Sequence, residues 1–235
     1  METMAERLRQ VQERIRTAAL GAHRDPSEVR LVAVCKTYPA ETVAEAVACG
    51  QTCFGENKVQ EAAAKIPAVQ SAVRLEWHLV GHLQSNKAQR SAELFDWVHS
   101  VDSLKVLSRL SEGAARAGKV LPVLLQVDLA GEATKAGLEA EELEEILASA
   151  GQFPHAEIRG FMLLPPFRED PEEVRPYFRQ LRGLRDRMAA RFPGLRLDQL
   201  SMGMSHDFEV AIQEGATMVR VGTAIFGSRP VPASG

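Results

Sequence analysis

One lysine stands out among the residues that could do chemistry, because it follows directly on a run of five apolar residues, 31–35. Such a run is typical of a parallel strand that is buried on both faces, with Lys36 at its carboxyl end. Burying an unpaired ammonium group is costly, so Lys36 is expected either to reach water or to be held for a reaction. Ligands bind at the carboxyl ends of parallel strands, and a partly desolvated lysine there becomes nucleophilic toward aldehydes, which is the Schiff-base role.

A second group of candidate residues follows the last two predicted strands, where glycines and hydroxyl side chains gather. The group consists of Ser201, Gly203, Gly222 and Thr223. Loops after strands seven and eight commonly bind phosphate in (β/α)8 barrels, because glycines let backbone N–H groups approach an anion and hydroxyls add donors. Glycine turns that cap helices would have the same composition. Together with the lysine, a phosphate site suits an aldehyde carried on a phosphate, and pyridoxal 5′-phosphate (PLP) is such a compound.

Arg220 lies in the apolar segment 218–222, on the face of the predicted strand opposite Val219 and Val221. An arginine in so apolar a strand needs an acceptor, and either a structural salt bridge or a pyridine ring nitrogen would serve. Because arginine keeps its proton, such a nitrogen would stay unprotonated. A ring in that state is a poor electron sink, which disfavours transaminase-like chemistry.

Other polar residues near predicted strand ends are weaker candidates. Asn57 could reach a ring hydroxyl or cap the helix that follows it. His78 and His82 are possible acid–base groups, although a strand histidine is commonly packed and hydrogen-bonded. Lys87 and Lys135 are alternative aldehyde-reactive lysines in polar surroundings, where we expect them to be solvated.

Composition limits the function classes. The chain has 235 residues, 45% of them hydrophobic and 25% charged, with a net charge of −3. This charge gives no support for a basic surface that binds nucleic acid or anionic membrane. The sequence has neither an apolar run of membrane-spanning length nor a signal peptide, so we expect a cytoplasmic protein. The three cysteines fit no CxxC or zinc spacing, and we expect them to be reduced and mostly packed.

Strand-like and helical patterns alternate eight times, after one amphipathic helix at the N-terminus. The predicted strands are 31–36, 52–55, 75–80, 96–101, 121–128, 158–163, 197–200 and 218–221. This order predicts an α/β fold, a single (β/α)8 TIM-type barrel with an extra N-terminal helix, while a doubly wound sheet remains the alternative. We expect one domain over residues 1–235, a mobile segment at 130–137 and a frayed tail at about 230–235.

These residues taken together resemble the YggS/PROSC family, PLP-binding proteins of the alanine-racemase-like barrel type (PLP fold type III). The matching motifs are Val-Ala-Val-Cys-Lys-Thr (32–37), Gly-Glu-Asn-Lys-Val-Gln-Glu (55–61), Trp-His-Leu-Val-Gly-His-Leu-Gln-Ser-Asn-Lys (77–87), His-Ser-Val-Asp (99–102), Arg-Gly-Phe-Met (159–162), Leu-Ser-Met-Gly-Met-Ser (200–205) and Arg-Val-Gly-Thr-Ala-Ile-Phe-Gly (220–227). They occur in the family's order over nearly the whole chain.

The resemblance implies that Lys36 holds PLP as a Schiff base, with Arg220 at the ring nitrogen and Asn57 beside the ring. It assigns the phosphate to the second group of candidates, Ser201, Gly203, Gly222 and Thr223. It also implies a role in the supply of vitamin B6, PLP homeostasis, without an established catalytic activity. Three positions depart from the family pattern, where proline, asparagine and an acidic residue are common. They are His82, Asp128 and His206.

The alternative to a carrier is a racemase-like PLP enzyme, which needs a base on each face of the substrate α-carbon. Lys36 can supply one base. The two-domain racemases take the other from a tyrosine of a second domain, whereas Tyr38 here lies on the same edge as Lys36 and Tyr177 lies in the predicted helix 171–191. The sequence therefore favours a monomeric PLP carrier that serves apo-PLP enzymes. A third possibility is a barrel whose phosphate ligand forms no Schiff base.

Overall fold

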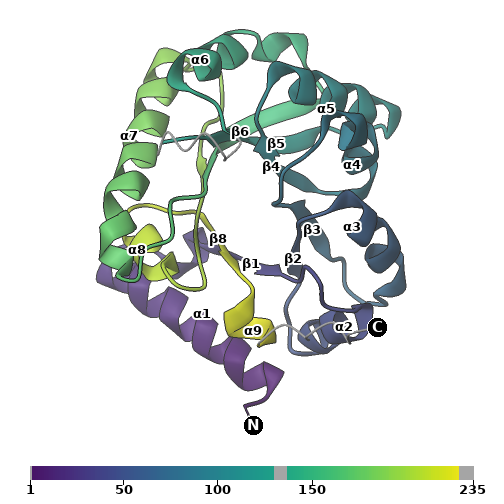
Figure 1. Cartoon of the computed structure of the whole chain (residues 1–235), viewed down its shortest axis with the longest axis vertical. Helices are drawn as coiled ribbons and strands as arrows, with labels where there is room; N and C mark the ends of the chain where they lie inside the picture. The colour runs from purple at the N-terminus through teal and green to yellow at the C-terminus, as the bar shows by residue number, and fades with distance from the viewer. Residues whose placement is uncertain (1, 130–136, 228–235) are drawn as a thin grey trace.

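Eight parallel strands close into a barrel in chain order, with β1 paired to both β2 and β8 (Figure 1). The structure is a computed structural model that describes residues 2–129 and 137–227. The strands are β1 (Arg30–Val34), β2 (Cys53–Glu56), β3 (Glu76–Leu79), β4 (Trp97–Val101), β5 (Leu121–Val127), β6 (Ala156–Leu163), β7 (Gln199–Met204) and β8 (Met218–Val221). This closure confirms the predicted barrel and excludes the open, doubly wound sheet.

The helices lie around the outside of the ring of strands (Figure 1). They are α1 (Met4–Gly21), α2 (Ala40–Ala48), α3 (Val59–Lys65), α4 (Ala88–Leu94), α5 (Leu104–Arg116), α6 (Ala140–Ala148), α7 (Arg175–Arg191), α8 (Phe208–Gln213) and α9 (Thr223–Phe226). Side chains alternate between the two faces of each strand, so β8 turns Val219 and Val221 toward the helices and Met218 toward the barrel interior. The interior cluster comprises Val32, Val34, Cys53, Val80, Trp97, Leu124, Met162 and Met218.

Helix α1 is the extra N-terminal helix that the sequence predicts. Its first turn is closed by a capping box, in which the side chains of Thr3 and Glu6 each bond the other's backbone N–H. Its buried face packs on α8 and α9. Arg7 ties it to α9 by donating from Nε to the carbonyl of Ile225 at 2.5 Å.

Two element boundaries differ from the sequence prediction near the candidate residues. Strand β1 ends at Val34, two residues before Lys36, which lies in the turn that follows. Strand β7 runs to Met204, so Ser201 and Gly203 lie in a strand and not in a loop. Gly203 has φ +90°, and a Cβ there would lie 2.6 Å from the Cβ of Ala211 in α8. The glycine that resembles a turn signal is thus required by close strand–helix packing.

Further predictions concern the cysteines, membrane-spanning segments, and the mobile segment and tail. All three cysteines are free thiols, Cys35 and Cys53 buried and Cys49 exposed. Among the described residues no helix is both long and apolar enough to cross a bilayer. The predicted mobile segment, apart from residue 137, and the predicted frayed tail lie outside the described residues.

Candidate functional site

Strand register brings Lys36 and Asn57 to equivalent places at one end of the barrel. Val34 pairs with Gly55 across β1 and β2, and each candidate lies two residues beyond its member of the pair. Both side chains are half-buried. Helix α3 starts at Val59 without a side-chain cap bond, so Asn57 does not cap it. Its amide thus lies at the carboxyl ends of the strands, where ligands bind in this fold.

A buried clamp holds the residue before Lys36. The backbone N–H of Cys35 donates to the carbonyl of Gly55 at 2.9 Å, and Lys65 Nζ donates to the carbonyl of Cys35 at 2.8 Å. Lys65 also forms an ion pair with Glu56, whose Oε1 accepts a bond from the Cys35 thiol at 3.2 Å. Burial and the Glu56 carboxylate raise the pKa of this thiol well above its usual range. Cys35 is therefore a packed hydrogen-bond donor and not a reactive thiolate.

The turn after Lys36 is strained. Thr37 has φ +70°, in the left-handed region that a β-branched residue rarely adopts. Such a conformation costs about 1–3 kcal/mol and persists only where the surroundings enforce it. The clamp on Cys35 provides this constraint on one side of the turn. Strain of this kind next to a candidate residue is common at functional sites.

The predicted phosphate residues divide into two places. Gly222 and Thr223 lie where β8 meets α9, and a Cβ on Gly222 would come 3.2 Å from the carbonyl of Val34. This glycine therefore brings the start of α9 close to the end of β1, and so close to Lys36. The N–H of Gly222 donates to the hydroxyl of Ser205 at 3.2 Å. Ser205 thus contacts the β8–α9 junction and does not cap α8, which has Asp207 at its N-cap position.

Ser201 lies deeper, inside the barrel, where it contacts Arg220. Arg220 Nη1 donates to the Ser201 hydroxyl at 2.6 Å, and Nη2 donates to the carbonyl of Leu163, the last residue of β6, at 2.8 Å. Within the described residues no carboxylate lies at ion-pair distance from Arg220. Burial lowers the pKa of this guanidinium to about 10, and the charge of Asp207 opposes the shift. The salt-bridge alternative is therefore not what the structure shows.

From Ser201 a line of hydrogen bonds continues through the barrel interior to β3. His99 Nδ1 lies 2.9 Å from the Ser201 hydroxyl, and its Nε2 lies 2.7 Å from His78 Nδ1. His78 Nε2 in turn lies 2.6 Å from Oε1 of Glu76. We call Arg220, Ser201, His99, His78 and Glu76 the interior chain. It links the Arg220 guanidinium to the opposite, amino-terminal end of the strands.

Physical chemistry assigns a direction to the interior chain. A carboxylate only accepts, so Nε2 of His78 carries the proton that bonds Glu76. Burial lowers the pKa of His78 and, more strongly, that of His99, so both rings are neutral and each has one donor and one acceptor. His99 therefore donates from Nε2 to His78 and accepts at Nδ1 from the Ser201 hydroxyl. Arginine only donates, which agrees with its bond to Ser201.

The other candidates lie away from Lys36 or have structural partners. His78 belongs to the interior chain, while His82 is exposed and pairs with Asp102 at 3.1 Å. Lys87 is half-buried at the end of a short 3-10 helix, and Lys135 lies outside the described residues. The Tyr38 hydroxyl donates to the carbonyl of Gly227 at 2.7 Å.

All three departures from the family pattern lie in loops that follow strands at this end of the barrel, with His82 three residues after β3. Nε2 of His206 lies 3.1 and 2.9 Å from the carbonyls of Arg168 and Glu169 in the loop after β6. Asp128 directly follows β5, and its backbone N–H donates to the carbonyl of Leu138 at 3.2 Å.

Sequence reasoning missed His99, Glu76 and the Glu56–Lys65 pair. The only signal in the sequence is that His78 and His99 are polar residues within two apolar predicted strands, and the structure places both side chains inside the barrel. The contacts of His99 depend on the assembled barrel, because its partner Ser201 lies 102 positions away in the sequence.

Comparisons with known proteins identify the family. The family described as alanine racemase, N-terminal domain, matches residues 7–230. The chain belongs to this family. A pyridoxal phosphate homeostasis protein of Pseudomonas aeruginosa is 46% identical over 229 residues, which cover 97% of this chain and 97% of that protein.

Solved structures show the same barrel. PipY of Synechococcus elongatus PCC7942, solved with PLP bound, matches with a TM-score of 0.84 and 42% identity, over 96% of this chain and 100% of that one. The alanine racemase of Bartonella henselae matches with a TM-score of 0.67 and 18% identity, over 95% of this chain and 61% of that one. At that identity the racemase shows a shared fold alone.

Proposed function

We propose that this protein binds PLP as a Schiff base on Lys36 and acts in intracellular PLP homeostasis without catalytic turnover. The observation that carries the proposal is the meeting of Lys36, Asn57 and the β8–α9 junction at one corner of the barrel mouth, above Arg220. The relatives named PLP homeostasis protein and the PLP-bound PipY structure support the choice of ligand.

The residues present fit this cofactor. Gly222 leaves space that a Cβ would fill, and the first N–H groups of α9 lack intrahelical partners, so the junction suits a phosphate group together with the Thr223 hydroxyl. The half-buried Asn57 amide would flank the ring, and Arg220 would face its nitrogen. When bound, PLP supplies a reactive aldehyde, and Lys36 is the amine that can hold it.

Ser201 and Gly203 would support the site indirectly. The Ser201 hydroxyl is engaged by Arg220 and His99, so it would orient the guanidinium. Gly203 lets α8 pack against β7. In this proposal their part in holding the phosphate is therefore smaller than the resemblance implies.

The racemase alternative receives less support. Racemisation needs a second base opposite Lys36. Tyr38 has structural contacts instead, because its hydroxyl donates a hydrogen bond to the carbonyl of Gly227 and its ring stacks on Phe226. Tyr177 packs in α7 on the outside of the barrel. Transfer of PLP to apo-enzymes, a monomeric state and a cytoplasmic location complete the proposal.

The visible absorbance of the PLP-loaded protein before and after borohydride, with peptide mapping, tests the assignment. We expect a band that borohydride removes and a mass gain on the peptide containing Lys36. Lys36→Ala should abolish the covalent adduct but keep weak, phosphate-dependent binding, because the β8–α9 junction is intact. The matched control Lys87→Ala should behave as wild type. Equal covalent labelling of Lys36→Ala would refute the Schiff-base assignment.

Carrier and racemase are distinguished by two further assays on the loaded protein. A carrier should restore activity to an apo-PLP enzyme and should leave L- and D-alanine unchanged. Steady racemisation that is lost in Lys36→Ala would favour the enzyme instead.

A further inference from the structure

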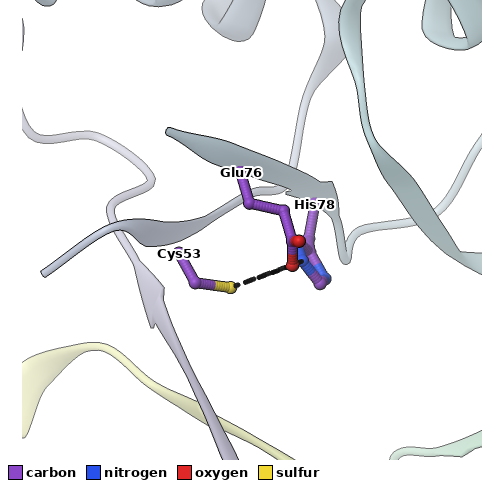
Figure 2. A group of neighbouring side chains, drawn as sticks. All are labelled: Cys53, Glu76 and His78. Carbon is purple, nitrogen blue, oxygen red and sulfur yellow. Dashed lines mark hydrogen bonds and ion pairs between the residues drawn. The ribbon is translucent and has the colours of Figure 1, made fainter. Parts of the chain in front are cut away.

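A mixed group of potential metal ligands lies at the end of the barrel opposite Lys36. Cys53 and Glu76 are the first residues of β2 and β3, and they pair directly across the two strands. His78 follows two residues after Glu76, on the same face of β3. Figure 2 shows the three side chains pointing toward one another from these neighbouring strands. Their ligand atoms all lie within 4.8 Å of one another.

We propose that Cys53, Glu76 and His78 form a binding site for a zinc-like divalent metal ion, independent of the PLP site. A thiolate, an imidazole and a carboxylate are the three ligand types that zinc accepts. Three protein ligands leave a fourth position for water or another small ligand, as in open zinc sites.

The separations between the ligand atoms are close to those of a tetrahedral site. With zinc bonds of about 2.0–2.3 Å, ligand atoms lie about 3.3–3.6 Å apart. Cys53 Sγ is 3.3 Å from His78 Nε2 and 3.8 Å from Glu76 Oε1. Nε2 and Oε1 are 2.6 Å apart because they share a hydrogen bond, which a metal ion would replace. Rotation of the Glu76 side chain would widen the Nε2–Oε1 distance to that of a tetrahedral site.

The histidine already has a suitable partner behind it. A metal-bound imidazole usually donates its other ring N–H to an acceptor, which fixes its orientation. Nδ1 of His78 lies 2.7 Å from Nε2 of His99. With a metal on Nε2, the His78 proton would sit on Nδ1 and bond His99, whose own proton would move to Nδ1 and face the Ser201 hydroxyl. Both rings change tautomer and neither changes its number of protons.

Access to the site is through Glu76 and Arg30, which are partly exposed. Arg30 donates from Nη1 to Oε1 of Glu76 at 2.7 Å, and the side chains are 43% and 37% exposed. An incoming ion would replace the guanidinium at this oxygen, and the exposed Arg30 side chain can turn to solvent. The Cys53 thiol, which is buried, releases its proton to solvent when the sulfur binds the metal.

Titration with Co²⁺, which substitutes for zinc and reports its ligands by colour, tests the proposal. We expect one equivalent to produce a sulfur-to-cobalt charge-transfer band in the difference spectrum, and zinc to abolish it. Cys53→Ser should lose this band, whereas Cys49→Ser, which alters the exposed thiol, should keep it. Glu76→Gln should weaken cobalt binding by about tenfold or more. Zinc X-ray absorption of the wild-type protein should show one sulfur neighbour.

Several results would overturn the site. These are a charge-transfer band that persists in Cys53→Ser or disappears in Cys49→Ser, cobalt binding without that band, and zinc with only oxygen and nitrogen neighbours. Should Cys53→Ser fail to fold, Glu76→Gln and the wild-type X-ray absorption still decide. PLP absorbance, measured on the same samples, tests the PLP proposal by itself. Failure of the metal site can therefore be distinguished from failure of the PLP site.

Discussion

Lys36 and Arg220 are cations that the barrel holds in different ways. Lys36 lies in a half-buried turn whose neighbours are constrained by a clamp and a strained backbone. Arg220 is buried among neutral acceptors, a hydroxyl and a carbonyl, and it remains protonated at neutral pH even though burial lowers its pKa to about 10. In the proposed function Lys36 would bind PLP covalently, while Arg220 would provide a fixed charge.

Replacing Arg220 tests the fixed charge. We expect Arg220→Ala to shift the absorbance of bound PLP more than it changes PLP affinity, because the ring nitrogen loses its donor while the phosphate contacts remain. Absorbance spectra and a PLP titration would measure both effects. Arg90→Ala, at an exposed arginine, is the control. An unchanged spectrum would contradict the ring-nitrogen role.

The buried histidines predict a dependence of stability on pH. Burial lowers the pKa values of His78 and His99 below the ordinary 6.5, so below that pH the unfolded state binds more protons than the folded state. Their contribution to the unfolding free energy therefore falls as pH falls through about 6.5 and is unchanged above it. Each histidine contributes a slope of up to about 1.4 kcal/mol per pH unit.

Urea unfolding at pH 7.5 and pH 5 would measure this effect. The loss of stability between the two values should be smaller in His99→Asn than in wild type, because one buried titrating ring is gone. His82→Asn, at an exposed ring, should retain the wild-type difference. Equal differences in all three proteins would count against the buried histidines as the cause.

At the scale of elements, the β1–α2 and β2–α3 connections are held together by one buried ion pair. Glu56 is fully buried and its Oε2 has no hydrogen-bond partner among the described residues, so its charge depends on Lys65. A buried charge that loses its partner costs about 3–5 kcal/mol. The pair also bonds the carbonyl and the thiol of Cys35, the residue directly before the turn at Lys36.

A double-mutant cycle tests this pair. We expect Glu56→Gln to lower the unfolding free energy by about 3–5 kcal/mol, because the buried Lys65 loses its ion-pair partner. Glu56→Gln combined with Lys65→Met should cost less than the sum of the two single changes. Additive losses, measured by denaturant unfolding, would show that the two residues act independently.

The sequence predicts the features that depend on neighbouring residues, and it misses those that depend on contacts between residues distant in the sequence. The apolar run before Lys36 and the alternation around Arg220 depend on burial alone. Arg220 lies in β8 as this pattern predicts, whereas Lys36 lies in the turn two residues beyond the end of β1. The sequence predicts Gly203 in a loop, and this is wrong, because a glycine required by helix packing looks the same in the sequence as a turn glycine. The positive φ of Thr37 has no local signal in the sequence, and the clamp two residues before it joins Cys35 to Glu56 and Lys65, which are distant in the sequence.

On the scale of the molecule, barrel closure brings distant segments together, and α1 packs beside the place where β1 and β8 pair. Strands β1 and β8 pair along four positions, and α1 packs against α8 and α9 beside them. The interior chain likewise needs strands β3, β4, β7 and β8 in place. Its polar residues are far apart in the sequence, which explains why periodicity alone could not predict their contacts.

Truncating the buried face of α1 should destabilise the whole barrel. We expect Leu8→Ala, which removes a buried side chain, to cost about 2–5 kcal/mol. Leu20→Ala, at an exposed position of the same helix, should cost less than about 0.5 kcal/mol. Far-UV dichroism and tryptophan fluorescence should report one coincident transition. Separate transitions would show that α1 unfolds independently of the barrel.

The direction of the interior chain has a consequence for magnetic resonance. The ring protons on Nε2 of the fully buried His78 and His99 lie in short hydrogen bonds, the first to the partly exposed Glu76 and the second to His78, so they should exchange slowly with water. Slowly exchanging imidazole protons resonate at low field, outside the crowded amide region. The two signals would thus be unlabelled reporters at the centre of the molecule, whose frequencies respond to whatever binds at either end.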